Sequence, residues 1–306
     1  MTIPSVPLGP TSDVDGLRPG SSDRQTTTLK IAQCADLPAL LPSTSINNTG
    51  LKLSRADLLR NYLFMRLPML GEQVYETYWL PMQDSLSNGE QQLMWLQLVL
   101  DGDDRVRRQD LFAAQQQRFE RPEVSEADIE AYIRELHRRS AHFRRIVRPE
   151  NEPDPLVRGH LIRLQDRQAV VAYPALMLLL DRRARGKADA AETARAMEYI
   201  ESFLVRRTIC RVPPNNLNRI FQAVPAQFPQ GVPVADGLHQ LLSAENRFWP
   251  DDEELRTKVR EAPFYRYGLP HQRRRVLQRL EEGYGHPEPT IPSRGDRDCC
   301  RAVTWK

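Results

Sequence analysis

Two stretches of the chain place polar side chains at a spacing that could bind a ligand. In the first, Asn48 and Gly50 favour a tight turn, and Asp57, Arg60 and Asn61 follow it on a predicted helix. Since these three residues stand at i, i+3 and i+4, they share one helix face. Amides could orient a ligand there, and the arginine could meet a phosphate. The alternative is a capped, half-buried helix in which Asp57 and Arg60 form only a local ion pair.

The second stretch joins arginines to amides at the end of a predicted helix. Arg206 and Arg207 close an apolar helix, and Asn216 and Asn218 follow in the turn after it. A guanidinium group suits phosphate and carboxylate because its donors form a rigid fork. This helix end is therefore the second candidate site for a ligand or for nucleic acid.

Residues for a recognisable catalytic mechanism do not stand out. No two of the six histidines stand at i, i+4, and the triplet from His286 to Glu288 lacks the P-C-x-x-C partner of zinc deaminases. The hydrolase elbow, the phosphate loop and the dinucleotide fingerprint are absent. No zinc or disulfide spacing relates the four cysteines, which are Cys34, Cys210, Cys299 and Cys300. We predict no catalytic residue, no metal site and no retained cofactor.

The elements that must position the two candidate sites are helices. Ser54 and Ser125 are N-caps with an aspartate three residues on, and Asp154 caps a helix that begins with Pro155. Apolar residues recur with helical period, and little β-branched alternation occurs. We therefore predict a mainly α multi-helix bundle with little or no β-sheet. After the helix that begins at Ser54, the predicted helices span 71–80, 90–100, 108–119, 125–147, 155–166, 175–185, 188–207, 216–224, 234–242, 251–260 and 270–284.

Prolines and composition shifts divide the chain into four segments. Residues 1–45 read as a disordered or degenerate N-terminal segment, since they are rich in Pro, Gly, Ser and Thr. Pro149, Pro153 and Pro155 mark the best internal boundary, which separates helical segments at 46–150 and 151–290. Residues 291–306 are predicted to form an unstructured tail.

The composition describes a folded protein that is rich in arginine. The 306 residues are 40% hydrophobic, enough for one large or two ordinary domains. The net charge is only +3, yet nearly all of the 43 basic residues are arginine. Phosphate binding explains this excess, and so does a GC-rich genome. Most basic clusters, such as Arg138 and Arg139 beside Glu135, are interleaved with acids, which is typical of a solvated, ion-paired face.

The apolar runs are short. The longest dense one, residues 175–180, falls far below the roughly 20 residues that cross a bilayer. No charged segment leads into an apolar stretch at the N-terminus. We expect a cytoplasmic protein with no membrane partner.

Four segments together resemble one protein family. They are INNTGLKLSRADLLRNYLFMRLP from Ile46, VYETYWLPMQ from Val74, VRRTICRVPPNNLNRIF from Val205, and the run from FWPDDEELRTKVR to EEGYGHPEP that begins at Phe248. They look like segments of the GmrSD-type restriction proteins, the modification-dependent type IV restriction endonucleases of bacteria. The resemblance covers about residues 46–290, the end of the N-terminal domain and the helical region after it.

The resemblance implies a DNA-directed role in phage defence. In that family the N-terminal domain resembles ParB and sulfiredoxin folds and carries an Asp-Gly-Gln-Gln-Arg motif associated with nucleotide binding and hydrolysis. Here Asp23 and Gln25 are only an echo of that motif. In that family the first motif of the nuclease domain resembles Ile-Glu-His-x-x-Pro. This chain continues from Ile291 without the Glu and the His. The family binds a nucleoside triphosphate and a divalent metal, and the resemblance assigns no residue of this chain to either of them.

We expect a truncated relative that lacks nuclease and nucleotidase activity on its own and binds DNA or a partner subunit, such as a separate nuclease or sensor. Two alternatives stay open. One is a non-enzymatic helical scaffold that binds protein, and the other is a non-functional remnant of a frameshifted gene. A measurement of salt-dependent DNA binding distinguishes the hypothesis of a DNA-binding protein from that of a protein-binding scaffold.

Overall fold

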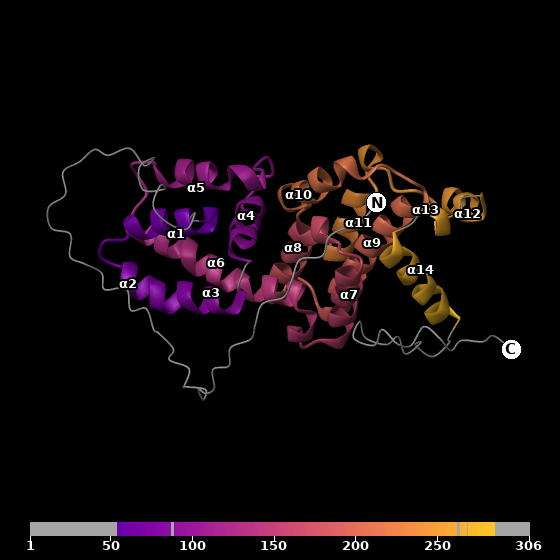
Figure 1. The fold of residues 1–306 in the computed structure, drawn as a ribbon, viewed down its shortest axis with the longest axis horizontal. Coiled ribbons are helices and arrows are strands. Elements are labelled where there is room, and N and C mark those ends of the chain that lie inside the picture. Colours follow the sequence, from indigo (N-terminus) through magenta and orange to yellow (C-terminus); the bar gives the residue numbers. More distant parts are fainter. Residues whose placement is uncertain (1–53, 87–88, 262–263, 268, 285–306) are drawn as a thin grey trace, which may run out of the picture. The chain divides into compact units, whose positions relative to one another are not determined.

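The structure is a computed structural model, and it describes residues 54–86, 89–261, 264–267 and 269–284. These residues are mainly α-helical and contain no strand, which confirms the predicted fold class (Figure 1). The turn with Asn48 and Gly50 lies outside the described residues. So do the two terminal segments, 1–45 and 291–306.

Capping boxes begin two helices where the sequence predicts them. In α1 (Arg55–Met65) the Ser54 hydroxyl accepts from the Asp57 N–H at 3.1 Å, and the Asp57 carboxylate accepts from the Ser54 N–H at 3.1 Å. In α6 (Glu126–Val147), Ser125 and Asp128 repeat the arrangement. The two reciprocal bonds occupy N–H groups that have no partner inside the helix.

One predicted helix end is wrong. The helix expected to stop before Pro81 continues as α2 (Gly71–Val74), a π-helical turn (Tyr75–Trp79) and α3 (Leu80–Leu86). Proline normally breaks a helix because it lacks an N–H and its ring meets the carbonyl four residues back. Here the Leu80 N–H bonds to the Tyr75 carbonyl, five residues back, so the widened turn shifts the carbonyl ladder just before Pro81.

The remaining helices agree with prediction to within a few residues, with two exceptions. Helix α10 continues through Pro225 beyond its predicted end at residue 224, and the short α13 was not predicted. No helix in the described part of the chain is both long and apolar enough to cross a membrane. The helices are α4 (Glu90–Leu100), α5 (Leu111–Phe119), α7 (Pro155–Asp166), α8 (Tyr173–Ala184), α9 (Ala190–Ile209), α10 (Leu217–Gln227), α11 (Val234–Leu242), α12 (Asp252–Glu261), α13 (Phe264–Tyr267) and α14 (Pro270–Gly283).

Helices α4 and α8 lie at the centre of the buried core. Residues Leu93 to Val99 of α4 are all buried, as its apolar sequence predicts, and α4 packs against α1, α6, α8 and α10. Helix α8 packs against α4, α6, α9 and α10. One cluster of buried side chains extends from Leu59 on α1 to Leu242 on α11. The helices on both sides of the predicted boundary near residue 150 thus share a core, and the assignment of the two segments to separate domains stays a prediction.

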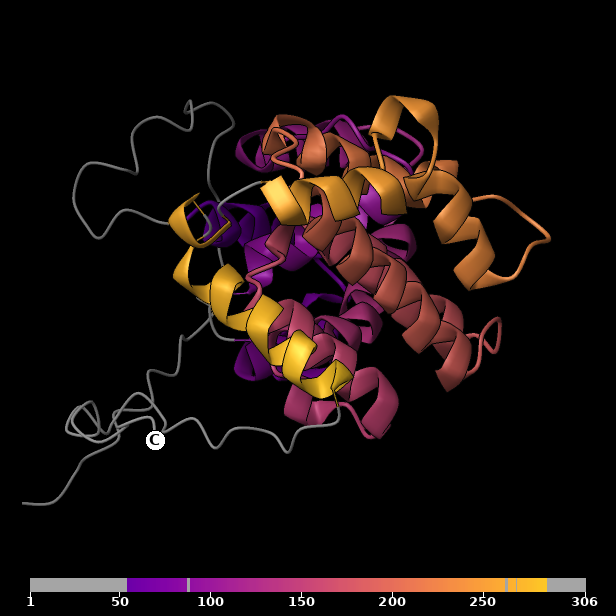
Figure 2. The ribbon, with the colours of Figure 1, turned by 90° about the vertical axis from the view of Figure 1, so that its right-hand side faces the viewer.

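Helix α9 is the scaffold of the C-terminal helices. It packs between α7 and α11 and also contacts α12, and it lies beside α11 in Figures 1 and 2. On α11 a Cβ at Gly237 would come within 3.0 Å of the Phe228 ring, so glycine allows this close approach. The packing brings the C-terminal end of α9 next to the turn of Pro214–Asn216 and the turn of Glu245–Arg247.

Candidate functional site

The predicted polar face of α1 is mostly engaged with itself. Arg60 lies 3.2 Å from the Asp57 carboxylate, and Asp57 also caps the helix. The hydrogen bond from Ser54 lowers the pKa of Asp57, which holds it as a carboxylate. Asn61 is exposed on the same helix. The local ion pair that the sequence allows as an alternative is therefore present.

A second acid lies near this face. Burial raises the pKa of Glu90, at the start of α4, and the charges of Arg60 and Asp57 act on it. One carboxylate oxygen of Glu90 is buried without a hydrogen-bond partner in the described residues. Two acids beside one arginine repel a phosphate, so this face is a poor anion site. Glu90 lies 33 positions beyond Asp57 in the sequence, and no motif links the two.

The second predicted site brings Arg207 and Asn216 together. The buried Arg207 guanidinium donates to the Asn216 side-chain oxygen at 2.8 Å and to the Pro213 carbonyl at 3.0 Å. It also donates to the backbone carbonyls of Arg247 at 2.5 Å and Phe248 at 3.0 Å. One side chain thus joins the end of α9 to two turns that follow it in the sequence.

The other two residues of that prediction lie elsewhere. Arg206 donates to the Pro250 carbonyl at 3.1 Å and pairs with the Asp252 carboxylate at the start of α12. Asn218 is exposed on α10. Neighbours in a helix point about 100° apart, so Arg206 and Arg207 reach different surroundings. The sequence predicted a single cluster, and the structure divides it.

Arg207 is a buried cation without a carboxylate partner in the described part of the chain. Burial lowers the pKa of its guanidinium, which reflects the cost of holding the charge there. Its Nε has no hydrogen-bond partner among the described residues. Carbonyl dipoles alone leave a net positive potential, which favours an anion nearby.

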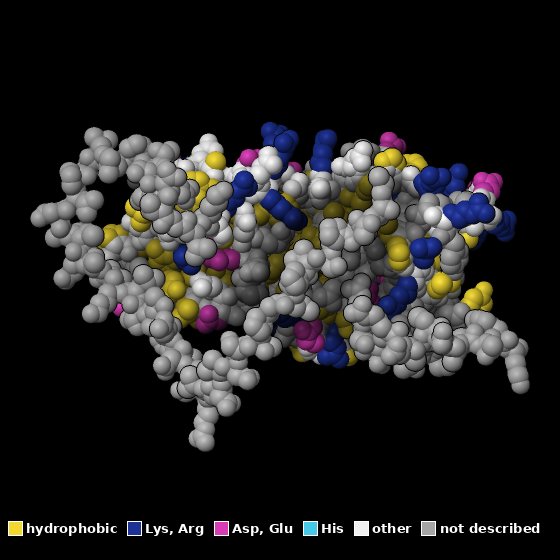
Figure 3. Space-filling view, in the orientation of Figure 1, with side chains coloured by type: hydrophobic (Ala, Val, Ile, Leu, Met, Phe, Trp, Pro, Cys, Tyr) yellow, Lys and Arg dark blue, Asp and Glu magenta, His cyan; other side chains and the backbone are white. Residues whose placement is uncertain are grey.

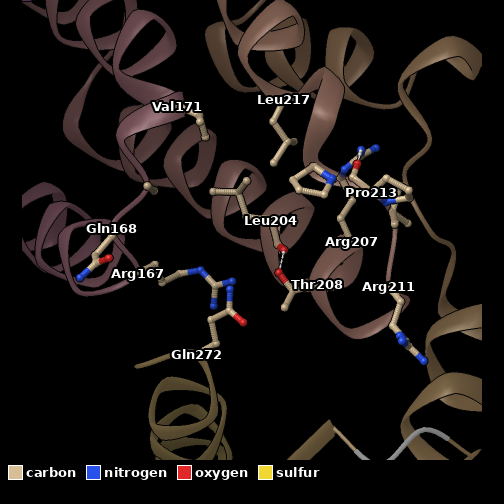
Figure 4. A pocket seen from close by; sticks show the side chains of 13 residues that line it. Arg167, Gln168, Val171, Leu204, Arg207, Thr208, Arg211, Pro213, Leu217 and Gln272 are labelled. Atoms are coloured by element: carbon tan, nitrogen blue, oxygen red, sulfur yellow. Dashed lines mark hydrogen bonds between the residues drawn. The ribbon is translucent and has the colours of Figure 1, made fainter. Parts of the chain in front are cut away.

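Arg207 lines a cavity of about 520 Å³ (Figure 4). We call it the arginine cavity. Arg167 lines it from the end of α7, and Arg207 and Arg211 line it from the end of α9 and the turn after it. In Figure 4 the Arg207 guanidinium turns toward Pro213, and the Arg211 side chain points away from Arg167. Val171, Leu204 and Leu217 supply apolar walls, and no acid is among its described lining residues. The remaining polar lining side chains are Gln168, Thr208 and Gln272.

Unusual backbone conformations surround the same arginine. The non-glycine residues with positive φ in the described ranges are Gln168 and Arg211, both at 56°, and Phe248 at 51°. Gln168 and Arg211 line the arginine cavity, and the Phe248 carbonyl accepts from Arg207. Each such residue costs about 1–2 kcal/mol and persists where its surroundings hold it. Nothing in the sequence pattern marks these three positions.

Several basic residues outside the cavity are ion-paired, as the interleaving with acids predicts. Arg138 pairs with Glu135 and with Asp181, and Arg134 pairs with Glu130. On the face drawn in Figure 3 the basic side chains are dispersed, and acidic side chains lie between several of them. The acid-free lining of the arginine cavity contrasts with this surface.

Titratable groups on α7 and α9 pair with one another. Glu201 on α9 lies 2.8 Å from His160 Nδ1 and accepts from Arg163 Nε at 3.1 Å. The charge of this buried carboxylate is thus balanced by the His160 imidazole and the Arg163 guanidinium that face it. No group of three His, Cys, Asp or Glu side chains in the described ranges is placed to hold a metal ion.

Comparison with family models, with curated proteins and with solved structures finds no match to this chain. The resemblance to the GmrSD-type proteins therefore stays a prediction. What the geometry itself establishes is an all-helical core whose most distinctive polar feature is the arginine cavity at the end of α9.

Proposed function

We propose that the protein binds nucleic acid, in the first place DNA, through phosphate groups that enter the arginine cavity. The observation that carries the proposal is the lining itself. Three arginines line the cavity, and none of its described lining residues is acidic. The Nη groups of Arg207 already donate to protein oxygens, so its Nε–H is the donor that remains for a phosphate. Guanidinium groups bind phosphate through paired charge-assisted hydrogen bonds, and such contacts supply most of the affinity for a nucleic-acid backbone.

The proposal makes this chain a recognition protein rather than a nuclease. The resemblance to modification-dependent restriction proteins supplies the expectation of DNA and of a role in phage defence. Cleavage would belong to a separate nuclease subunit, because no residue of this chain carries over the family's metal-dependent chemistry. The nucleoside triphosphate of the family likewise has no assigned site here.

The test is salt-dependent binding of labelled DNA to the full chain and to cavity variants. We expect Arg167→Gln and Arg211→Gln each to weaken binding by about tenfold, since one charge-assisted bond contributes roughly 1.5–3 kcal/mol. Each should also reduce the slope of log affinity against log salt by about one. Arg195→Gln is the matched control, because Arg195 is an exposed arginine on the same α9 that lies outside the cavity lining.

Two results would contradict the proposal. One is the absence of DNA binding at low salt, and the other is binding that does not weaken as salt rises. A helical protein-binding scaffold would then be the better description. A groove of about 450 Å³ on another face of α9 favours that second candidate, because charged side chains such as Arg163 and Glu198 border an apolar floor of Val205, Ile209, Leu255, Val259 and Val276.

A further inference from the structure

A second cavity adjoins the arginine cavity. It has a volume of about 300 Å³, and the two cavities share Gln168 and Ala169 as lining residues. Its lining is apolar, with Leu161, Leu164 and Leu176 among the contributing side chains. We call it the apolar cavity. A ligand that fills both must therefore be anionic at one end and apolar at the other.

The polar groups of the apolar cavity are neutral. They are the amides of Gln165 and Gln168 and the hydroxyl of Tyr173, and no lining residue is charged. Burial raises the pKa of Tyr173, so its hydroxyl stays protonated and can donate. An aromatic ring can stack on a flat apolar group, and side-chain amides can pair with the donors and acceptors on its edge. Gln165 Nε2 donates to the Val147 carbonyl at 2.8 Å, so this amide offers its oxygen. These are the features that bind a nucleobase.

We propose that the two cavities together bind one unstacked nucleotide of a single strand, with its phosphate at the arginines and its base in the apolar cavity. This inference rests on the proposed function and narrows its ligand. In a duplex the bases are paired and stacked, so a base can enter only if it is first extruded, which costs free energy. Single-stranded DNA should therefore bind more tightly than a duplex of the same length.

The experiment compares ligands that differ only in their bases. Binding of the full chain is measured by fluorescence anisotropy at one fixed salt concentration. The probes are a labelled oligothymidylate, a strand of equal length made of abasic residues, and the thymidylate strand in a duplex. Stacking of one base contributes enough to expect the abasic strand to bind about tenfold more weakly. The duplex should also bind more weakly than the single strand.

A variant separates the two cavities. Val170 lines the apolar cavity but not the arginine cavity, and its side chain is 39% exposed. Val170→Trp should fill the entrance and weaken oligothymidylate binding about tenfold, while leaving the affinity for the abasic strand unchanged. Ile162→Trp is the matched control, because Ile162 on α7 is likewise exposed, at 43%, and lines neither cavity, so this variant should bind both strands as the unaltered chain does. If Val170→Trp does not fold, the comparison of the three probes on the unaltered chain still tests whether a base is bound.

The outcomes distinguish this inference from the proposed function. Equal affinity for the thymidylate and abasic strands would overturn the inference and leave phosphate binding intact. Equal affinity for single strand and duplex would overturn it as well. No binding of any strand at low salt would contradict the proposed function itself. Competition with dTMP identifies the source of the ligand. If dTMP displaces the labelled strand as well as an unlabelled strand does, the site binds free nucleotides, and if dTMP displaces it less well, the site binds a strand. In both cases one ligand places its phosphate and its base in the two cavities.

Discussion

The polar face of α1 and the arginine end of α9 look alike in the sequence and behave differently in the structure. On α1, Asp57 finds its partners within one helical turn, and Arg60 adds to its pair with Asp57 a long 3.5 Å bond to Gln83. On α9, Arg207 holds backbone carbonyls that lie up to 41 positions away. Local contacts leave a helix self-contained, whereas long-range contacts build a cavity between segments.

The difference follows from burial. Ion pairs that water and salt can reach are screened, so the partly buried Asp57–Arg60 pair contributes little. The charge of Arg207 is withdrawn from water, so every donor that lacks a partner raises the free energy. Such a group fixes the position of the chain around it, which is why the unusual backbone conformations collect there.

The largest expected effect comes from removing the arginine that joins the turns. Arg207→Met leaves one buried and three partly buried acceptors without their donor, and we expect the free energy of unfolding to fall by about 3–5 kcal/mol. Urea denaturation measures it. Arg206→Met is the matched control, since its ion pair with the exposed Asp252 is worth about 0–1 kcal/mol. Equal losses from the two variants would erase the contrast between the buried contacts of Arg207 and the more exposed contacts of Arg206.

The second effect is a loss of stability in acid, and it arises where α6 packs against α8. His142 on α6 is buried, neither ring nitrogen has a hydrogen-bond partner among described residues, and burial lowers the pKa of His142 to about 4. The unfolded chain, with a histidine pKa near 6.5, binds the proton first. Stability is therefore complete above about pH 6.5 and falls between there and pH 4, by on the order of 3 kcal/mol.

His142→Leu tests that assignment, because leucine cannot take up a proton. Denaturation in urea between pH 7 and pH 4 should show a shallower loss of stability in the variant than in the unaltered chain. Parallel curves would mean that other groups cause the acid sensitivity.

A smaller effect is expected at the cap of α1. Ser54→Ala removes the hydroxyl that accepts from the Asp57 N–H and should cost about 1 kcal/mol. Ser125→Ala at the matching cap of α6 provides the comparison, and thermal unfolding measures both. Because the contact is local, neither DNA binding nor the arginine cavity should change. A loss of DNA binding in Ser54→Ala would make the α1 face a functional site after all.

The smallest expected effect comes from the Asp57–Arg60 pair. Arg60→Gln should destabilise the chain by only about 0.3–0.5 kcal/mol, the usual value for such pairs on a helix. The effect should shrink as salt is added. A loss above about 2 kcal/mol would show that Arg60 is held by Glu90 in the way that Arg207 is held by its carbonyls.

The sequence by itself determined the helices and their starts. Ser54, Ser125 and Asp154 cap the helices predicted from them, because a capping bond joins residues two or three positions apart. The apolar run of α4 likewise predicts its central place in the core. The sequence also identified Arg207 and Asn216 as members of one site, since they flank one turn. These are properties of short segments.

Only the tertiary structure decided what surrounds those segments. It separated Arg206 from Arg207, brought Glu90 near Asp57, and carried the helix through Pro81 by a π-helical turn. It also joined Arg167 and Gln168 to the end of α9 in one cavity. The approach of Glu90 to Asp57 and of Arg167 to the end of α9 joins helices that are far apart in the sequence, where burial rather than local spacing sets the free energy.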